Sequence, residues 1–351
     1  MKKKLFNLIF IILLILSSTN LLQAKRAAII IDYHTNETLF EVNADTLNYP
    51  ASLAKMMTLY LTFEALENNK INWEQDLKVS KIASSRSPSK LYLEAGNTIK
   101  VKDAIMALIT KSANDVATVI AESLATTEKD FAKKMTRKSK ELGMKNTTFK
   151  NASGLPNRAQ LTTARDIAIL SRALIKDFPE YYKLFSIQKF SWNGKSFKNH
   201  NKLLKTYDGA DGIKTGYIRA SGFQLAFSAV RNNRRLIGIY FGGDTAKHRD
   251  NTLKFLMNKE FGELSELNFS KGDYKIVVGT FKYEKNALKQ SKIIKSVFPS
   301  TFTSKKSNIM KRKGKNRSFY ETQFLSFEKK EARKVCSLLK KNKFDCFIVK
   351  I

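Results

Sequence analysis

The sequence predicts an α+β protein of two domains, and two observations carry this prediction. Strand-like segments lie at both ends of residues 25–265, and a long block of helical pattern separates them. Segments that are distant in the chain are therefore expected to share one antiparallel sheet, with helices flanking it. Residues 270–351 repeat a shorter strand–helix pattern, which predicts a second, smaller domain.

The first element in the chain is expected to be a signal peptide, residues 1–24. Lys2–Lys4 precede the apolar run Leu5–Leu16, and the small residue Ala24 ends the segment. An apolar run this short falls below the ~18 residues that span a bilayer. We expect export and cleavage near Ala24, on the periplasmic or cell-wall side of the inner membrane. An uncleaved anchor stays the alternative, because Leu22 occupies a position that is usually small.

A hairpin and a buried helix are expected next. Ala27–Asp32 and Thr38–Val42 have the pattern of paired strands. The helix beginning at Pro50 is apolar nearly all round as far as Phe63, which is typical of a helix buried in a core. Its first turn nevertheless contains Lys55, and a charged side chain in a buried helix needs a functional or structural explanation.

Residues 53–174 are mostly helical in pattern. Val101–Leu124 is one long helical stretch, and another helix follows Thr162 or Thr163, either of which can serve as its N-cap. Asp166 then falls in the first turn, where a negative charge is favourable.

Strands return near the end of the first domain. Ile213–Ile218 follows a glycine-rich segment, and Gly222–Val230 and Arg235–Gly243 predict a second hairpin around the turn Arg231–Arg234.

The second domain is expected to alternate strands and helices. Lys305–Arg317 is a basic stretch and is interpreted as an exposed turn. The remaining segments are the strands Tyr274–Phe281, Ser318–Phe327 and Phe344–Ile351 and the helices Glu284–Val297 and Lys329–Lys341.

The cysteine and histidine content argues against a metal site. Cys336 and Cys346 are the only cysteines, and His34, His200 and His248 are far apart in sequence. No metal and no cofactor is predicted. In an exported protein the two cysteines can form a disulfide, and two buried thiols are the alternative.

The net charge of +32 is extreme, and 49 of the 63 basic residues are Lys. Their spread along the whole chain favours a general lysine bias. Attraction to acidic wall polymer or lipid head groups is the functional alternative. Export makes nucleic acid an unfavoured partner.

Ser52 and Lys55 carry the first chemical signal, because residues three apart share a helix face. Burial lowers the pKa of a lysine, and a neutral amine can take the proton of a neighbouring hydroxyl. Ser52 would also lie at a helix start, where backbone N–H groups favour developing negative charge. The S-x-x-K pattern occurs five times in this lysine-rich chain, so it is weak evidence alone.

Two downstream motifs make the signal specific. Ser112-Ala113-Asn114 lies between two apolar helical runs, and Lys214-Thr215-Gly216 occurs once, on an expected strand. There a lysine and a threonine can bind a carboxylate, and Gly216 lets a substrate lie along the strand.

This ordered set resembles the penicillin-recognising serine enzymes, namely penicillin-binding proteins and β-lactamases. Further segments resemble their serine-type D-alanyl-D-alanine carboxypeptidase branch, the low-molecular-mass penicillin-binding proteins. These segments are Tyr49–Thr58, Lys111–Asp115, Asn151–Pro156, Thr162–Asp166 and Asp211–Tyr217.

The resemblance implies a β-lactamase/transpeptidase-like fold and a role for each matching residue. Ser52 is implied as the nucleophile on the peptide bond between two terminal D-alanines, with Lys55 as general base. Ser112 is implied to relay a proton to the leaving amine, and Asn114 to contact the substrate amide and Lys55.

The strand motif is implied to hold the substrate. Lys214 and Thr215 would bind its terminal carboxylate, and Gly216 and Tyr217 complete the substrate-binding set. The backbone N–H groups of Ser52 and Tyr217 would form the oxyanion hole. Inhibition by β-lactams follows from the same resemblance.

Other functions with the same motifs stay open. A D,D-endopeptidase or transpeptidase would use the same residues on cross-links. A β-lactamase of class A needs a Glu to activate water, and none occurs between Glu141 and Glu180. A non-catalytic wall-binding protein would need no lysine in a buried helix.

The C-terminal residues 270–351 resemble a SPOR domain, a small βαββαβ fold that binds peptidoglycan glycan strands. Tyr320–Lys350 matches its second half. The resemblance implies targeting to the wall or the septum, without naming glycan-binding residues. Oligomeric state and peripheral membrane contact stay open.

Overall fold

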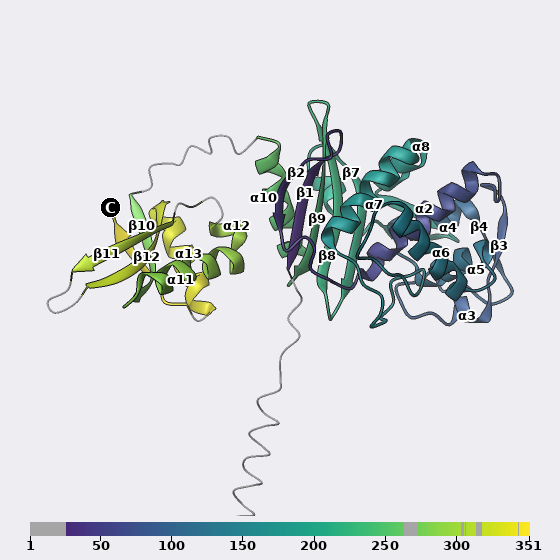
Figure 1. Cartoon of the computed structure of the whole chain (residues 1–351). Coiled ribbons are helices and arrows are strands. Elements are labelled where there is room, and N and C mark those ends of the chain that lie inside the picture. The colour runs from purple at the N-terminus through teal and green to yellow at the C-terminus, as the bar shows by residue number, and fades with distance from the viewer. Residues whose placement is uncertain (1–25, 263–272, 303–304, 306, 314–317, 343) are drawn as a thin grey trace, which may run out of the picture. The chain divides into compact units, whose positions relative to one another are not determined.

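The computed structural model describes residues 26–262, 273–302, 305, 307–313, 318–342 and 344–351 (Figure 1). The chain divides into two compact units, Met1–Met257 and Asn258–Ile351. The expected signal peptide, 1–24, and the expected domain boundary between 265 and 270 lie outside the described residues.

The first unit is built around one five-stranded antiparallel sheet with the order β2-β1-β9-β8-β7. The N-terminal hairpin joins the later strands through β1, where Ile30 lies opposite Gly238 of β9. The expectation that both chain ends form one sheet is confirmed. The strands are β1 (Ala27–Asp32), β2 (Thr38–Val42), β7 (Ala210–Ile218), β8 (Gly222–Arg231) and β9 (Arg234–Gly243).

Helices cover both faces of this sheet (Figure 1). On one face lies α10 (Ala246–Glu260), which packs so closely that a Cβ on Gly238 would lie 2.9 Å from Leu253 and 2.8 Å from the sulfur of Met257. On the other face lies α7 (Ala164–Asp177), followed by the rest of the helical block.

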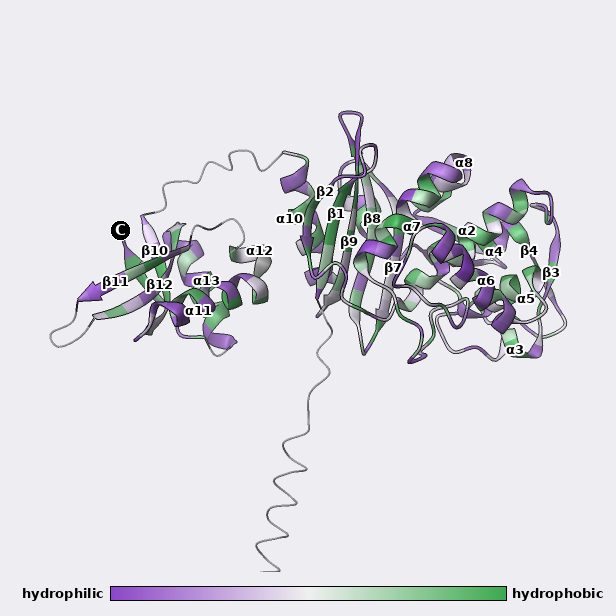
Figure 2. Cartoon of the chain, viewed as in Figure 1, coloured by the Kyte–Doolittle hydropathy of each residue, from purple (hydrophilic) through white to green (hydrophobic). Residues whose placement is uncertain are grey.

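The helical block combines apolar helices with amphipathic ones, such as the largely hydrophilic α6 (Figure 2). Its longer members are α2 (Ala54–Glu67), α4 (Val101–Thr110), α5 (Asn114–Leu124) and α6 (Glu128–Glu141). Shorter elements are η1 (Ala51–Leu53), β3 (Asp76–Lys78), α3 (Lys81–Ser84), β4 (Thr98–Lys100), α8 (Pro179–Tyr182), η2 (Lys183–Ser186), β5 (Lys189–Trp192), β6 (Lys195–Lys198) and α9 (Leu203–Thr206).

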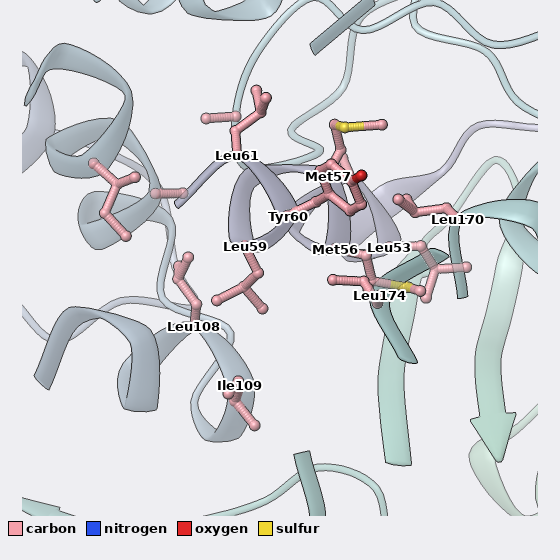
Figure 3. Packing of buried hydrophobic residues seen from close by; sticks show 14 of the residues in the cluster. Leu53, Met56, Met57, Leu59, Tyr60, Leu61, Leu108, Ile109, Leu170 and Leu174 are labelled. Atoms are coloured by element: carbon pink, nitrogen blue, oxygen red, sulfur yellow. The ribbon is translucent and has the colours of Figure 1, made fainter. Parts of the chain in front are cut away.

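Helix α2 lies at the centre of the hydrophobic core, as its all-round apolar pattern predicts. Leu59 points towards Leu108 of α4, whereas Met56 lies beside Leu170 and Leu174 of α7 (Figure 3). Burial on every side fixes the position of its first turn, and therefore of Lys55, by close packing.

The expected helix Val101–Leu124 is interrupted. It forms α4 and α5, because Ser112 between them adopts a left-handed backbone conformation with φ +60°. At the other expected helix start, the Thr163 side chain accepts a hydrogen bond from the Asp166 N–H at 3.1 Å and is the N-cap of α7.

The second unit has a four-stranded sheet of order β11-β12-β10-β13. The interpretation of Lys305–Arg317 as an exposed turn is wrong in part, because Ser307–Lys313 pairs with β12 as an edge strand; residues 306 and 314–317 lie outside the described residues. The last strand begins later than expected, at Phe347. The elements are β10 (Tyr274–Phe281), α11 (Glu284–Val297), α12 (Pro299–Phe302), β11 (Ser307–Lys313), β12 (Ser318–Phe327), α13 (Lys329–Lys341) and β13 (Phe347–Lys350).

A disulfide joins Cys336 of α13 to Cys346 just before β13, with a Cα–Cα distance of 5.3 Å. Of the two alternatives that the sequence left open, the structure therefore has the disulfide. Among the described residues, no helix combines the length and apolar character needed to cross a bilayer.

Candidate active site

The candidate site is a cavity of about 470 Å³ in the first unit, between the sheet and the helical block. Segments that are far apart in sequence meet there. Of the residues predicted from sequence, its lining includes Ser52, Ser112, Asn114, Thr215, Gly216 and Tyr217. Lys55 and Lys214 are buried beneath this surface.

Ser52 lies in the short 3-10 turn η1, immediately before α2, and is half-buried. Ala51 before it has φ +46°, and Gly154 has φ +84° and packs directly against it. A Cβ on Gly154 would lie 1.7 Å from the Ala51 carbonyl oxygen. Only glycine permits this approach, so Gly154 helps to hold the backbone at Ser52.

Lys55 is fully buried and donates three hydrogen bonds. Its Nζ lies 3.2 Å from Ser52 Oγ, 2.7 Å from Asn114 Oδ1 and 2.6 Å from the Ser153 carbonyl oxygen. Burial is the main cause of a pKa well below the usual value for lysine, and the positive charge of Lys214 lowers this pKa further. Asp115 and Glu128 oppose the shift with their negative charges.

A second layer supports the loop that contacts Lys55. The carboxylate of Glu128 accepts a hydrogen bond from the Ala152 N–H at 3.0 Å and forms an ion pair with Arg86. The next carbonyl, that of Ser153, is the one that binds Lys55 Nζ. Glu128 therefore positions the acceptor, in addition to contributing its charge.

Ser112 lies in the break between α4 and α5, and Asn114 is the first residue of α5. The buried Ser112 Oγ has no hydrogen-bond partner among the described residues, and it faces the cavity. Asn114 bridges Lys55 and the Ser87 carbonyl, to which its Nδ2 donates at 2.8 Å. The unused hydroxyl is available to a bound substrate.

Strand β7 forms the opposite wall, and Lys214 is almost fully buried in it. Burial lowers the pKa of Lys214 to about 7, and the charge of Arg249 adds to this shift. Its Nζ donates to the Thr215 carbonyl at 3.1 Å. The ammonium form is therefore poorly compensated until an anion enters the site.

The structure adds a packing reason for Gly216, and the expected role, to let a substrate lie along the strand, stays a prediction. A Cβ at this position would lie 2.8 Å from Gln224 Oε1 and 3.3 Å from the Pro50 carbonyl oxygen. Gln224 Nε2 donates to the Tyr49 carbonyl at 2.8 Å, so this side chain joins β8 to the segment before Ser52. The glycine allows the two walls to approach each other.

Tyr217 is 54% exposed and packs against Phe223, with the ring centroids 4.3 Å apart. The pair forms a partly apolar rim of the cavity.

Sequence reasoning missed Arg249 of α10, which lines the cavity and is buried. Its guanidinium donates to Asp250 Oδ1 at 2.6 Å and to the Gln224 carbonyl at 3.2 Å. No local motif identifies this arginine, because it reaches the cavity from α10, which lies on the other face of the sheet from the helical block.

The described residues contain no group of three or more His, Cys, Asp or Glu side chains that could hold a metal ion. The chemistry available is a hydroxyl beside a buried amine, an unpaired second hydroxyl, and a cationic wall at one end.

Comparisons with known proteins agree with this geometry. The family described as D-alanyl-D-alanine carboxypeptidase matches residues 17–245, and the SPOR domain family matches residues 270–350. D-alanyl-D-alanine carboxypeptidase DacF of Bacillus subtilis is 33% identical over 255 residues, which are 70% of this chain and 64% of that protein. DacC of Escherichia coli is 35% identical over 243 residues, 67% of this chain and 61% of that protein. The chain thus spans slightly less than two thirds of these curated relatives.

Solved structures show the same similarity. Penicillin-binding protein 6B of Escherichia coli aligns with a TM-score of 0.64 and 31% identity over 73% of this chain and 79% of that chain. Penicillin-binding protein D2 of Listeria monocytogenes, in its ampicillin-bound form, aligns with a TM-score of 0.62 and 34% identity over 67% of this chain and 96% of that chain.

Proposed function

Because the chain belongs to the D-alanyl-D-alanine carboxypeptidase family and has a C-terminal SPOR domain, we propose that it removes the terminal D-alanine from peptidoglycan stem peptides. The observation that carries this proposal is the buried Lys55 amine, 3.2 Å from the Ser52 hydroxyl at a helix start. A buried amine with a lowered pKa is suited to act as a general base.

In the proposed acylation Lys55 is the neutral amine. Its two N–H groups donate to Asn114 Oδ1 and the Ser153 carbonyl, and its lone pair takes the proton of Ser52 Oγ as this oxygen attacks the peptide carbonyl. The backbone N–H groups of Ser52 and Tyr217 stabilise the resulting oxyanion. The C–N bond then breaks. Ser112 donates its hydroxyl proton to the leaving amine of D-alanine and receives in turn the proton that Lys55 took from Ser52, which returns Lys55 to the neutral form. Water hydrolyses the acyl-enzyme and regenerates Ser52.

The terminal carboxylate of the substrate binds at the cationic end of the site. Lys214 and Thr215 are the proposed ligands, and Arg249 adds a second positive charge beside them. Asn114 contacts the substrate amide. A carboxylate in this place compensates the charge of the buried Lys214 ammonium, so binding of the substrate also removes an unfavourable buried charge.

The C-terminal unit and the export of the protein complete the proposal. The SPOR domain holds the protein on peptidoglycan glycan strands, including those at the septum. The substrate lies on the cell-wall side of the membrane, where a cleaved signal peptide would deliver the enzyme.

Mass spectrometry of the purified protein after incubation with penicillin tests the proposal. We expect one covalent adduct at Ser52, no adduct in Ser52→Ala, and release of D-alanine from a pentapeptide. Cleavage of a cross-linked dimer into its two peptides, without release of D-alanine from a pentapeptide, would identify an endopeptidase instead. Absence of both the adduct and any release would refute the serine peptidase assignment.

A further inference from the structure

A second groove, of about 780 Å³, lies next to the candidate active site in the first unit. One loop joins the two, because Pro88 and Ser89 line the active-site cavity, whereas Leu91–Glu94 line the groove. Only Lys90 separates these stretches in sequence. The two sets of lining residues are therefore at most about 7 Å apart between Cα atoms, and a stem peptide of several residues that leaves the active site is long enough to reach the groove with its far end.

Tyr92 in this loop is held outwards by its neighbours. The N–H groups of Leu91 and Leu93 donate to the carboxylate of Asp115 at 3.1 and 3.2 Å. Tyr92 between them has φ +65°, a conformation that is unusual for a bulky residue, and it is 67% exposed. The buried Asp115 compensates the backbone strain, and the strain points to function at this position.

The ring of Tyr92 is therefore exposed on a fixed backbone, with the Lys90 ammonium 5.2 Å from its centroid. A ring held in this way is a favourable binding platform, because little conformational entropy is lost when a ligand covers it. A second aromatic residue also lines the groove, the half-buried Trp192 at the end of β5, beside Asn193 in the turn of that hairpin. Asn97 and Thr98 add neutral hydrogen-bonding groups.

The charged residues of the groove nearly balance, which argues against a strongly charged ligand. Those that line it are Asp76, Glu94 and Asp103 together with Lys100 and Lys195. Glu94 Oε2 accepts from Asn97 Nδ2 at 3.2 Å, and Asp76 lies 3.8 Å from the Lys100 ammonium. The first contact satisfies Glu94 as an acceptor, and the second offsets the charge of Asp76. A neutral ligand with apolar faces and many hydroxyl or amide groups fits two aromatic rings and an amide-rich rim.

We propose that this groove binds the sugar to which the substrate's stem peptide is attached, an N-acetylated amino-sugar disaccharide. The C–H face of a sugar ring packs on Tyr92 and Trp192, and its hydroxyl and acetamido groups bond to the polar rim. This inference rests on the proposed function, and it places a glycan contact on the catalytic unit in addition to the SPOR domain.

The test compares two soluble substrates of the full-length protein, a free pentapeptide and the same pentapeptide linked to the disaccharide. We expect kcat/KM to be about tenfold higher for the linked substrate. Tyr92→Ala should remove this preference without changing hydrolysis of the free peptide, and Tyr92→Phe should keep it. Leu47→Ala, which alters an exposed apolar residue outside the groove, is the matched control and should keep it too.

Equal kcat/KM values of the unaltered protein on both substrates would overturn the proposal. An equal loss on both substrates in Tyr92→Ala would also overturn it, and would assign Tyr92 to support of the neighbouring Asp115 segment. A loss confined to the free peptide would identify a peptide site instead.

Failure to hydrolyse either substrate would count against the proposed function and not against the groove. The groove is then tested by NMR titration of the disaccharide alone into the full-length Tyr92→Ala and Leu47→Ala proteins, which share the C-terminal domain. We expect the apparent affinity of Tyr92→Ala to be at least fivefold weaker, and equal affinity would overturn the proposal.

Discussion

The start of α2 and the strand β7 each bury a lysine, yet the two amines have different surroundings. Lys55 donates to three oxygens, from Ser52, Asn114 and the Ser153 carbonyl. Lys214 donates to one, the carbonyl of its own neighbour Thr215. Burial and a neighbouring positive charge lower the pKa of both lysines, Lys214 acting on Lys55 and Arg249 on Lys214, but carboxylates oppose the shift at Lys55.

The difference indicates that one amine has a complete set of partners before substrate arrives and the other does not. A general base needs fixed geometry relative to its hydroxyl, which the three contacts of Lys55 supply. A lysine that binds a substrate carboxylate contributes most when the positive charge of the lysine is otherwise uncompensated, as at Lys214. The two buried lysines are therefore expected to respond differently to the same substitution.

The largest expected effect is that of Lys55→Met, which keeps the volume of the side chain and removes the base. We expect the rate of penicillin acylation at Ser52 to fall by about 10²- to 10⁴-fold, the range for loss of a general base. Stopped-flow labelling measures it. Lys70→Met, at an exposed lysine after the same helix, is the control and should acylate at the normal rate. A loss below tenfold would assign the proton transfer to another group.

Lys214→Met should act on binding instead of on proton transfer. We expect KM for a peptide ending in a free carboxylate to rise about tenfold, since a charge-assisted hydrogen bond contributes about 1.5–3 kcal/mol and Arg249 remains. A peptide ending in a carboxamide should be little affected. Steady-state kinetics on this pair of peptides measures the effect. An equal loss on both peptides would remove the distinction between the two lysines.

The pH dependence of stability should also report on Lys214. Its pKa is lowered to about 7 in the folded protein, so between about pH 7 and its unfolded pKa near 10.5 the unfolded chain binds more protons. This residue therefore contributes a stability that increases with pH across that window, by at most about 1.4 kcal/mol per pH unit.

Denaturant unfolding from pH 7 to 10 measures this contribution as the difference between the unaltered protein and Lys214→Met. The variant should show a smaller increase of stability with pH. Lys205→Met, at an exposed lysine, should follow the unaltered protein. Identical slopes in all three proteins would show that Lys214 keeps its ordinary pKa when the protein is folded.

The smallest expected effect is that of Glu128→Gln, which removes a charge behind the Lys55 site. Because the negative charge of Glu128 raises the pKa of Lys55, its loss lowers that pKa further. Lys55 then stays neutral to lower pH, and the acidic limb of the plot of acylation rate against pH moves to lower pH. We expect acylation near neutral pH to change by less than about tenfold, and stability to fall by about 1–3 kcal/mol because Arg86 loses its partner.

If the acidic limb of the acylation profile moves to higher pH in Glu128→Gln, the prediction that the pKa of Lys55 falls is wrong. Glu122→Gln, at another carboxylate of the same helical block, is the control and should leave the profile in place.

Much of the fold followed from local sequence patterns. The period of apolar residues predicted β1 and β2 with their observed bounds, and the all-round apolar pattern predicted that α2 is buried. In the second unit the edge strand β11 was missed, because a strand with one free edge and a polar surface has no clear apolar alternation.

For the candidate site, the motifs identified residues that the structure brings together, namely Ser52, Lys55 and Asn114. Their catalytic roles stay predictions until they are measured. Arg249 and Gln224 had no such signal. Both reach the site through contacts between elements that are far apart in the chain.

Local order and spacing along the chain were thus sufficient to indicate the helix start at Ser52, the spacing of Lys55 and the two-domain organisation. The break at Ser112, the reason for Gly216 and the disulfide between Cys336 and Cys346 depended on the folded arrangement. Periodicity reflects which side of an element is buried, because burial repeats with the backbone geometry. It contains no information on which distant side chain or carbonyl lies opposite, and that closeness determines each of these three features.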